Sequence, residues 1–199
     1  MAGSVQLFKR RVTTPVKCGE VTIGGCASIA IQTMTKCDTR DVSATVSQIW
    51  ESVAAGADIV RVAVIDTEAA DAIASIKKEI SCPLVADIHF DYRLALRSLE
   101  AGADKVRLNP GNIGGEGPFR AVVKLAKSAG ASIRVGINAG SLEKDILAKH
   151  GSPTPEAMVE SVSRSLAYID DLDFSDIVLS LKSSGVKETI EAYVLMAEQ

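Results

Sequence analysis

The chain of 199 residues is 47% hydrophobic, 24% charged and only 4% aromatic, and its formal net charge is −3 at pH 7. This length and balance fit one globular domain and exclude disordered and collagen-like classes. The net charge and scarce aromatic residues argue against nucleic acid as a partner, because they provide neither a basic field nor a stacking surface. No apolar run reaches the roughly twenty residues of a membrane span, so we expect a soluble, cytoplasmic protein.

A repeated segment organises the chain. Residues 55–62, AGADIVRV, recur almost unchanged at 101–108 as AGADKVRL, and each copy follows a helical pattern that ends at its glycine. Each copy is typical of a helix end, a glycine with positive φ, a short turn and a β-branched strand. Repetition of strand, helix and strand predicts a parallel sheet.

Six strands and several capped helices are predicted in chain order. The strands are residues 29–34, 59–64, 84–88, 106–108, 133–137 and 177–181. The helices are residues 43–55 after Asp41, 68–80 after Thr67, 92–101 after Asp91, and a later helix with Thr154 as its cap and Pro155 at its first position. We expect glycines to end three helices, at Gly56, Gly102 and Gly130.

The pattern of elements favours a (β/α) TIM-type barrel over a doubly wound sheet. No strand is followed by the GxGxxG turn of a dinucleotide fold, and the GNIGGEG segment at 111–117 has the wrong spacing. A full barrel has eight strands. Residues 1–199 are therefore predicted to form an incomplete barrel, with about six of the eight β/α units.

Polar residues occur near the carboxyl end of every predicted strand. Reactive groups of such barrels lie at that end, and side chains two apart on a strand share a face. The candidates for binding are Gln32, Arg61, Asp87, His89, Arg107, Asn109, Arg134, Asn138 and Lys182. Five cationic or imidazole groups at one mouth require anions, and one aspartate is not enough. We predict a diphosphate site, because arginine forks engage phosphate oxygens, with the amide side chains holding ligand hydroxyls.

Asp87 and His89 are candidates for a catalytic role because they are two apart on one strand. They would act either as an acid/base pair or with Asp87 fixing the tautomer of the imidazole. Positioning is the favoured interpretation, since a carboxylate among cations stays ionised and donates protons poorly. No metal site is predicted, because Cys18, Cys26 and the two other cysteines lack the spacing of metal ligands.

Several long motifs resemble the N-terminal barrel of the 4-hydroxy-3-methylbut-2-enyl diphosphate synthase family. The motifs are VADIHFDYRLAL at 85–96, RLNPGNIG at 107–114, GINAGSLEKDIL at 136–147 and TPEAMVES at 154–161, with QTMT at 32–35 and LSLKSS at 179–184. The likeness extends from about Val21 to the last residue. It implies reductive opening of 2-C-methyl-D-erythritol 2,4-cyclodiphosphate, with loss of water, to 4-hydroxy-3-methylbut-2-enyl diphosphate.

The resemblance also implies roles for residues and partners. Diphosphate binding is implied for Arg61, His89, Arg107, Arg134 and Lys182, and the same pocket would be lined by Asp87, Asn109 and Asn138. Electrons would come from ferredoxin or flavodoxin through a 4Fe-4S cluster. In the family, a C-terminal domain carries that cluster on three cysteines and a glutamate and closes over the partner's barrel in a homodimer.

This chain departs from that pattern. The last two barrel strands and the iron-sulfur domain are absent from its 199 residues, and none of its cysteines matches a ligand position. The chain is therefore expected to be a substrate-binding part of such an enzyme and inactive alone.

Two alternatives stay open. One is a metal-free lyase or transferase barrel acting on another phosphorylated or pterin-like substrate, which would need a base. Lys182 is the only well-placed lysine, and a phosphate contact is its favoured role, because a Schiff-base lysine needs an apolar pocket. The other alternative is a non-catalytic module that binds a diphosphate.

Overall fold

The computed structural model describes residues 11–199, so the first ten residues of the predicted 1–199 domain lie outside it. An antiparallel hairpin, β1 (Val16–Cys18) and β2 (Val21–Ile23), precedes a parallel sheet of six strands. The sheet contains β3 (Gln32–Met34), β4 (Ile59–Val64), β5 (Leu84–Ile88), β6 (Lys105–Leu108), β7 (Ser132–Asn138) and β8 (Ile177–Lys182). Each strand pairs with the next in chain order, without the reversal that defines a doubly wound sheet.

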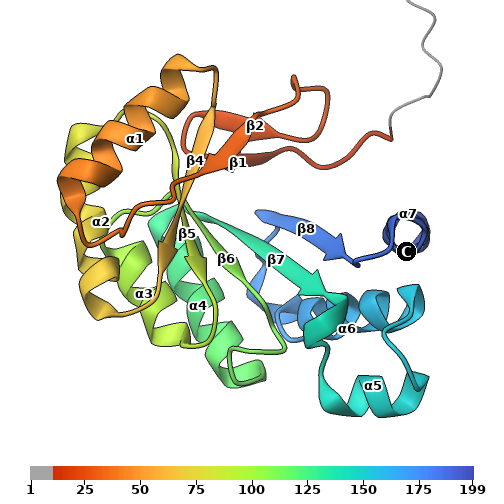
Figure 1. Ribbon diagram of the computed structural model, residues 1–199. Helices are drawn as coiled ribbons and strands as arrows, with labels where there is room; N and C mark the ends of the chain where they lie inside the picture. The colour runs from red at the N-terminus through yellow and green to blue at the C-terminus, as the bar shows by residue number, and fades with distance from the viewer. Residues whose placement is uncertain (1–10) are drawn as a thin grey trace, which may run out of the picture.

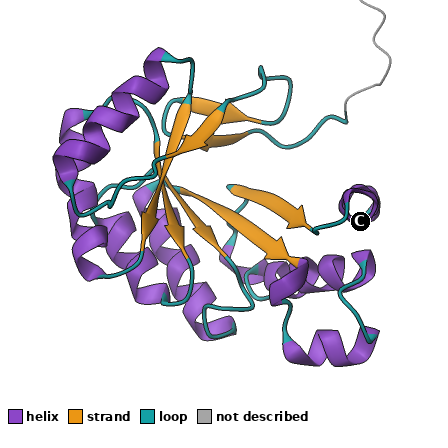
Figure 2. Ribbon diagram, in the orientation of Figure 1, coloured by secondary structure: helices purple, strands orange, loops and turns teal. Residues whose placement is uncertain are grey.

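Helices connect the strands or follow them. They are α1 (Val42–Ala54), α2 (Thr67–Glu79), α3 (Tyr92–Glu100), α4 (Glu116–Ala129), α5 (Lys144–His150), α6 (Pro155–Ala167) and α7 (Val186–Glu198), with the 3-10 turns η1 (Ala139–Ser141) and η2 (Asp170–Leu172). Figure 1 shows the strands fanning out from the region of the hairpin, with α1 to α4 along the outside of β4 to β6. Figure 2 shows the same division into a helical outer layer and an inner layer of strands. The predicted incomplete barrel is confirmed.

Side chains on the strands alternate between two environments. On β4, Val60, Val62 and Val64 are at most 1% exposed and belong to the large core shared with the helices. Ile59, on the other face, packs with Val85 and with Cys18 of the hairpin. The hairpin therefore covers the amino end of the barrel interior, and the polar residues further along the same face lie toward the carboxyl end.

The aspartate of the repeated segment fixes the start of a neighbouring strand. Asp58 Oδ2 accepts a hydrogen bond from Ile31 N at 2.7 Å, just before β3. Asp104 Oδ2 accepts one from Leu84 N, the first residue of β5, also at 2.7 Å. The glycines of the two copies have φ values of 100° and 94°, as the pattern predicted. The repeat is thus a structural device that turns the chain and aligns adjacent strands.

Three details differ from the sequence-based expectations. The cap of α2 is Asp66 rather than Thr67, because Asp66 Oδ1 accepts from Ala69 N at 2.9 Å. The first strand of the sheet begins at Gln32, and the preceding Ile29 and Ile31 are 78% and 59% exposed. The β1–β2 hairpin was not predicted. Among residues 11–199, no helix has both the length and the apolar character to cross a membrane.

Replacing Asp104 tests the role of the repeat. The free energy of unfolding of Asp104→Ala is expected to fall by about 1–3 kcal/mol, because the buried Leu84 N–H loses its acceptor and Lys77 Nζ loses a contact of 2.6 Å. Asp104→Asn should lose less, since its amide oxygen can still accept. Urea unfolding followed by circular dichroism measures both. If Asp104→Ala unfolds like the exposed control Asp170→Ala, the role is refuted.

Candidate anion-binding site at the barrel mouth

The register of the strands places the predicted polar residues in tiers on the inner face. Asp87 of β5 is level with Arg107 of β6, and Arg107 is level with Arg134 of β7. Asn138 of β7 is level with Lys182 of β8 at the carboxyl end of the sheet. Parallel pairing thus brings residues from distant parts of the sequence to one side of the sheet.

Asp87 is the centre of the charged cluster. Its side chain is 6% exposed, and its Oδ1 accepts a hydrogen bond from Arg107 Nη1 at 3.3 Å. Its Oδ2 lies 3.6 Å from Arg61 Nε and 3.7 Å from His89 Nε2. The last two distances are electrostatic contacts rather than strong hydrogen bonds. One carboxylate therefore contacts Arg61 of β4, Arg107 of β6 and His89, which directly follows its own strand. A positioning role for Asp87 stays a prediction.

Arg134 lies beside this cluster without a carboxylate of its own among residues 11–199. Its Nη2 donates to Ser180 Oγ at 2.9 Å. Burial lowers the pKa of Arg134, and the guanidinium groups of Arg61 and Arg107 lower it further. An arginine nevertheless keeps its charge in a protein. The inner face therefore holds three guanidinium groups and one buried carboxylate, an excess of positive charge that a bound anion would relieve.

Asn109 connects two loops at the mouth. It is 2% exposed, its Nδ2 donates to Ser141 Oγ at 2.7 Å, and its Oδ1 accepts from Gly111 N at 3.2 Å. Ser141 Oγ also donates to Asn138 O at 3.3 Å. Ile113, which is 2% exposed, anchors the same loop in the core. These contacts hold the mouth loops in place, and binding of a ligand hydroxyl by Asn109 or Asn138 stays a prediction.

Gln32 lies toward the amino end of the sheet, and Lys182 lies at its carboxyl end. Gln32 is level with Ile59 and lines a cavity of about 230 Å³ together with Lys105 and Arg134. Lys182 is exposed at the end of β8. The structure thus gathers Arg61, Asp87, His89 and Arg107 closely, adds Arg134, and places the remaining candidates above or below them. Ligand binding by the nine residues stays a prediction.

Lys105 is an inner-face residue that sequence analysis missed. It is 1% exposed, and burial lowers the pKa of its amine. The thiol of Cys18, on β1, faces it, and burial raises the pKa of that thiol to about 11. The available signal was the spacing of two residues from Lys105 to Arg107 and again to Asn109, which assigns all three to one face.

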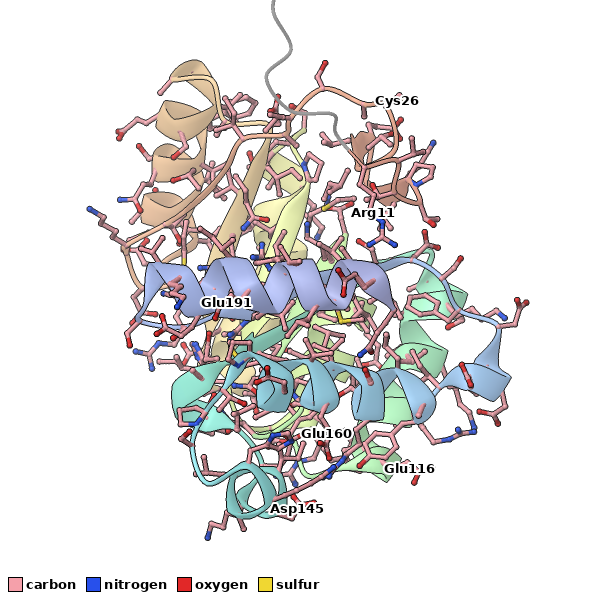
Figure 3. The ribbon with its side chains drawn as sticks, turned by 90° about the vertical axis from the view of Figure 1, so that its right-hand side faces the viewer. Arg11, Cys26, Glu116, Asp145, Glu160 and Glu191 are labelled. Carbon is pink, nitrogen blue, oxygen red and sulfur yellow. The ribbon has the colours of Figure 1, made fainter. Side chains whose placement is uncertain are left out.

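The described residues do not supply a ligand set for a metal or a cluster. Among residues 11–199, no group of three or more His, Cys, Asp or Glu side chains is close enough to hold a metal ion. Cys18 is buried, whereas Cys26 is exposed on the loop after the hairpin, away from α5 (Figure 3). The cysteines among the described residues therefore do not fit a 4Fe-4S cluster.

The second histidine belongs to the outer surface. His150 Nε2 lies 2.7 Å from Glu160 Oε2, and Lys149 Nζ donates to the same oxygen at 2.8 Å. These two hydrogen bonds lower the pKa of Glu160 to about 2. Figure 3 shows Glu160 on α6, on the side that faces α5. This cluster joins two helices and lies outside the mouth.

Two relatives of similar sequence carry the same name. The model of the GcpE TIM-barrel domain matches residues 13–199. A 4-hydroxy-3-methylbut-2-en-1-yl diphosphate synthase (flavodoxin) from Anoxybacillus flavithermus is 56% identical over 188 residues, which are 94% of this chain and 52% of that relative. The protein of the same name from Pseudomonas entomophila is 55% identical over 192 residues, or 96% and 52%. The chain spans about half the length of the curated relatives it matches.

Solved structures of low sequence identity share the architecture. A 7,8-dihydropteroate synthase from Vibrio fischeri superposes with a TM-score of 0.60 at 13% identity, covering 94% of this chain and 73% of that chain. Methylaspartate ammonia lyase from Clostridium tetanomorphum gives 0.59 at 14% identity, with coverage of 86% and 42%. At such identities the likeness shows the fold alone.

The variant Asp87→Asn tests the charge balance of the mouth. The free energy of unfolding is expected to fall by about 1–3 kcal/mol, because the guanidinium groups lose their carboxylate. Pyrophosphate should restore part of this loss, since a bound anion replaces the missing charge. Urea unfolding with pyrophosphate, and with sodium chloride of equal ionic strength, measures the effect.

The outer pair of Asp171 and Arg120 provides the matched control for that experiment. Pyrophosphate should stabilise Asp171→Asn no more than it stabilises the unmodified chain. If Asp87→Asn shows no pyrophosphate-specific recovery beyond that of Asp171→Asn, the anion-binding interpretation of the mouth is wrong.

Proposed function

The chain belongs to the GcpE TIM-barrel domain family, and on that premise we propose that it is the substrate-binding barrel of an oxidoreductase. The enzyme would reductively open 2-C-methyl-D-erythritol 2,4-cyclodiphosphate to 4-hydroxy-3-methylbut-2-enyl diphosphate. The observation that carries this proposal is the convergence of Arg61, Arg107 and Arg134 on an inner face with one buried carboxylate. The name of the relatives, which are diphosphate synthases, supports the choice of ligand.

The proposed roles follow from position in the mouth. The three arginines would bind phosphate oxygens as forks, and His89 and Lys182 would contact the phosphates from the rim. Asp87 would hold Arg61, Arg107 and His89 in the geometry that the ligand needs before it arrives, which lowers the cost of binding. Gln32, Asn109 and Asn138 would line the organic part of the site. Proton transfer by the pair of Asp87 and His89 is the alternative role for those two residues.

Redox partners belong to the same proposal. Ferredoxin or flavodoxin would deliver electrons, and the relatives' names specify flavodoxin. A 4Fe-4S cluster, when bound, would pass those electrons to the substrate. Its ligands would lie in a C-terminal iron-sulfur domain outside these 199 residues, since the described cysteines do not fit it. The likeness to the family also supports a homodimer of the full-length enzyme in the cytoplasm.

Lys182, the lysine that the sequence favours, does not have the environment of a Schiff-base lysine. Lys182 is exposed at the end of β8, whereas a lysine nucleophile needs a pocket that lowers its pKa. The low-identity likeness to dihydropteroate synthase shows a shared fold and assigns no substrate to this chain. A non-catalytic diphosphate-binding module differs from the proposed barrel only in the chemistry that follows binding.

Calorimetric titration with inorganic pyrophosphate tests the binding site. Arg107→Ala is expected to weaken binding by about 1–3 kcal/mol, because one charge-assisted contact is lost while neighbouring cations remain. Arg97→Ala is the matched control, since Arg97 pairs with Asp71 on the outer surface. Equal pyrophosphate affinities for Arg107→Ala, Arg97→Ala and the unmodified chain would refute the proposed diphosphate site.

A separate experiment tests the proposal that this chain binds the substrate and that an iron-sulfur domain supplies the redox centre. Treated anaerobically with iron, sulfide and dithionite, the chain is expected to yield no 4-hydroxy-3-methylbut-2-enyl diphosphate from the cyclic diphosphate. Phosphorus NMR monitors substrate and product, and the Anoxybacillus flavithermus relative serves as the positive control. Product formed by this chain alone would contradict the proposal that its redox centre lies elsewhere.

A further inference from the structure

The backbone conformation of Gly136 does not require a glycine at this position. It lies inside β7, is buried, and is not among the glycines with positive φ. A glycine inside a strand weakens that strand and often marks a site of close approach. A Cβ atom built at this position would lie 2.8 Å from Arg107 Nε, 3.2 Å from its Nη2 and 3.4 Å from its Cζ. The space of the missing side chain is therefore filled by the guanidinium group of Arg107.

We propose that Gly136 is a positioning residue for Arg107 in the anion-binding mouth. The absence of a side chain lets the guanidinium group lie against β7 while its Nη1 donates to Asp87 on β5 at 3.3 Å. Arg107 is thereby held from two sides, by a carboxylate on one and by a backbone surface on the other. The inference rests on the proposed function, because it concerns an arginine that we assign to the diphosphate.

The register explains why this position matters. Arg107 is level with Arg134 on β7, and side chains in a strand lean along its direction, so Arg107 reaches Gly136, two residues beyond Arg134. On the other side of β7, Ser180 is level with Gly136 and accepts the hydrogen bond from Arg134 Nη2. The guanidinium groups of Arg107 and Arg134 thus approach β5 and β8 respectively. Gly136 lies next to the guanidinium group of Arg107 and is level with Ser180, the partner of Arg134.

A comparison with Gly111 distinguishes this contact from an ordinary packing requirement. A Cβ atom at Gly111 would lie 2.6 Å from the backbone oxygen of Ser141, so the conflict there involves two loops of the fold. At Gly136 the three nearest atoms all belong to the far end of one long side chain, that of Arg107. The variant Gly136→Ala can therefore fold with β7 in place, and the group that moves is the guanidinium of Arg107.

The first measurement requires no ligand. Heteronuclear NMR of the arginine Nε–Hε groups detects the environment of Arg107, and Arg107→Lys identifies its signal by removing it. In Gly136→Ala this signal is expected to shift, because the Cβ atom displaces Nε. The control is Gly140→Ala on η1, where a Cβ atom meets nothing within 4 Å and the signal should stay. An unchanged Arg107 signal in Gly136→Ala would overturn the inference.

The second measurement is a double-mutant cycle on pyrophosphate affinity. Gly136→Ala is expected to weaken binding about tenfold, on the scale of one displaced hydrogen-bonding group, and Gly140→Ala should leave it unchanged. In the background of Arg107→Ala, the substitution at Gly136 should have no further effect. A tenfold loss in that background too would overturn the inference, because Gly136 would then act independently of Arg107.

The two measurements separate this inference from the proposed function. If the unmodified chain does not bind pyrophosphate and the Arg107 signal still shifts in Gly136→Ala, the diphosphate site fails and the positioning of Arg107 stands. If pyrophosphate binds and the cycle shows no coupling between Gly136 and Arg107, the site stands and the positioning role fails. Urea unfolding of Gly136→Ala confirms that both measurements report on a folded chain.

Discussion

The carboxylate of Asp87 lies between the guanidinium groups of two flanking strands, Arg61 on β4 and Arg107 on β6, and the geometry of the mouth depends on it. Without this charge, the guanidinium groups of Arg61 and Arg107 would face each other across β5 with no carboxylate between them. With it, both are held toward one point while Arg134 keeps no carboxylate among the described residues. A single carboxylate therefore reduces the repulsion between the guanidinium groups without neutralising their total charge. The remaining positive charge is available to a ligand.

This cluster exists because the strands are parallel and in register. The two copies of the repeated segment each place a glycine after a helix and an aspartate on the start of a neighbouring strand. That arrangement aligns β3 with β4 and β5 with β6, so inner-face positions meet in tiers. Fold and site are thus linked through backbone hydrogen bonds. An error of one residue in register would move the whole polar set to the helical side.

The spacing of two residues predicted much of the site. It assigned Asp87 with His89, and Arg107 with Asn109, to the same face. The register places Asp87 level with Arg107, whereas His89 and Asn109 directly follow the paired strands and have no register partner. The cap of α2 was misassigned because Asp66 and Thr67 are both suitable caps, and the choice depends on the extended backbone of Asp66. The β1–β2 hairpin escaped prediction because each strand has only three residues, too few to show a period. Gly136 escaped because a glycine shows no side chain whose chemistry could be recognised.

The two ends of the barrel interior differ in burial. At the amino end, Cys18 of the hairpin packs on Ile59 and Val85, and Lys105 is buried beside the thiol. Burial lowers the pKa of Lys105, so charge at this depth is costly, and the low dielectric lets any charge it carries act over a longer distance. The carboxyl end, in contrast, carries the exposed Lys182. Under the proposed function, an anion that enters at the mouth would meet Lys182 first and the guanidinium groups of Arg61, Arg107 and Arg134 deeper in the interior.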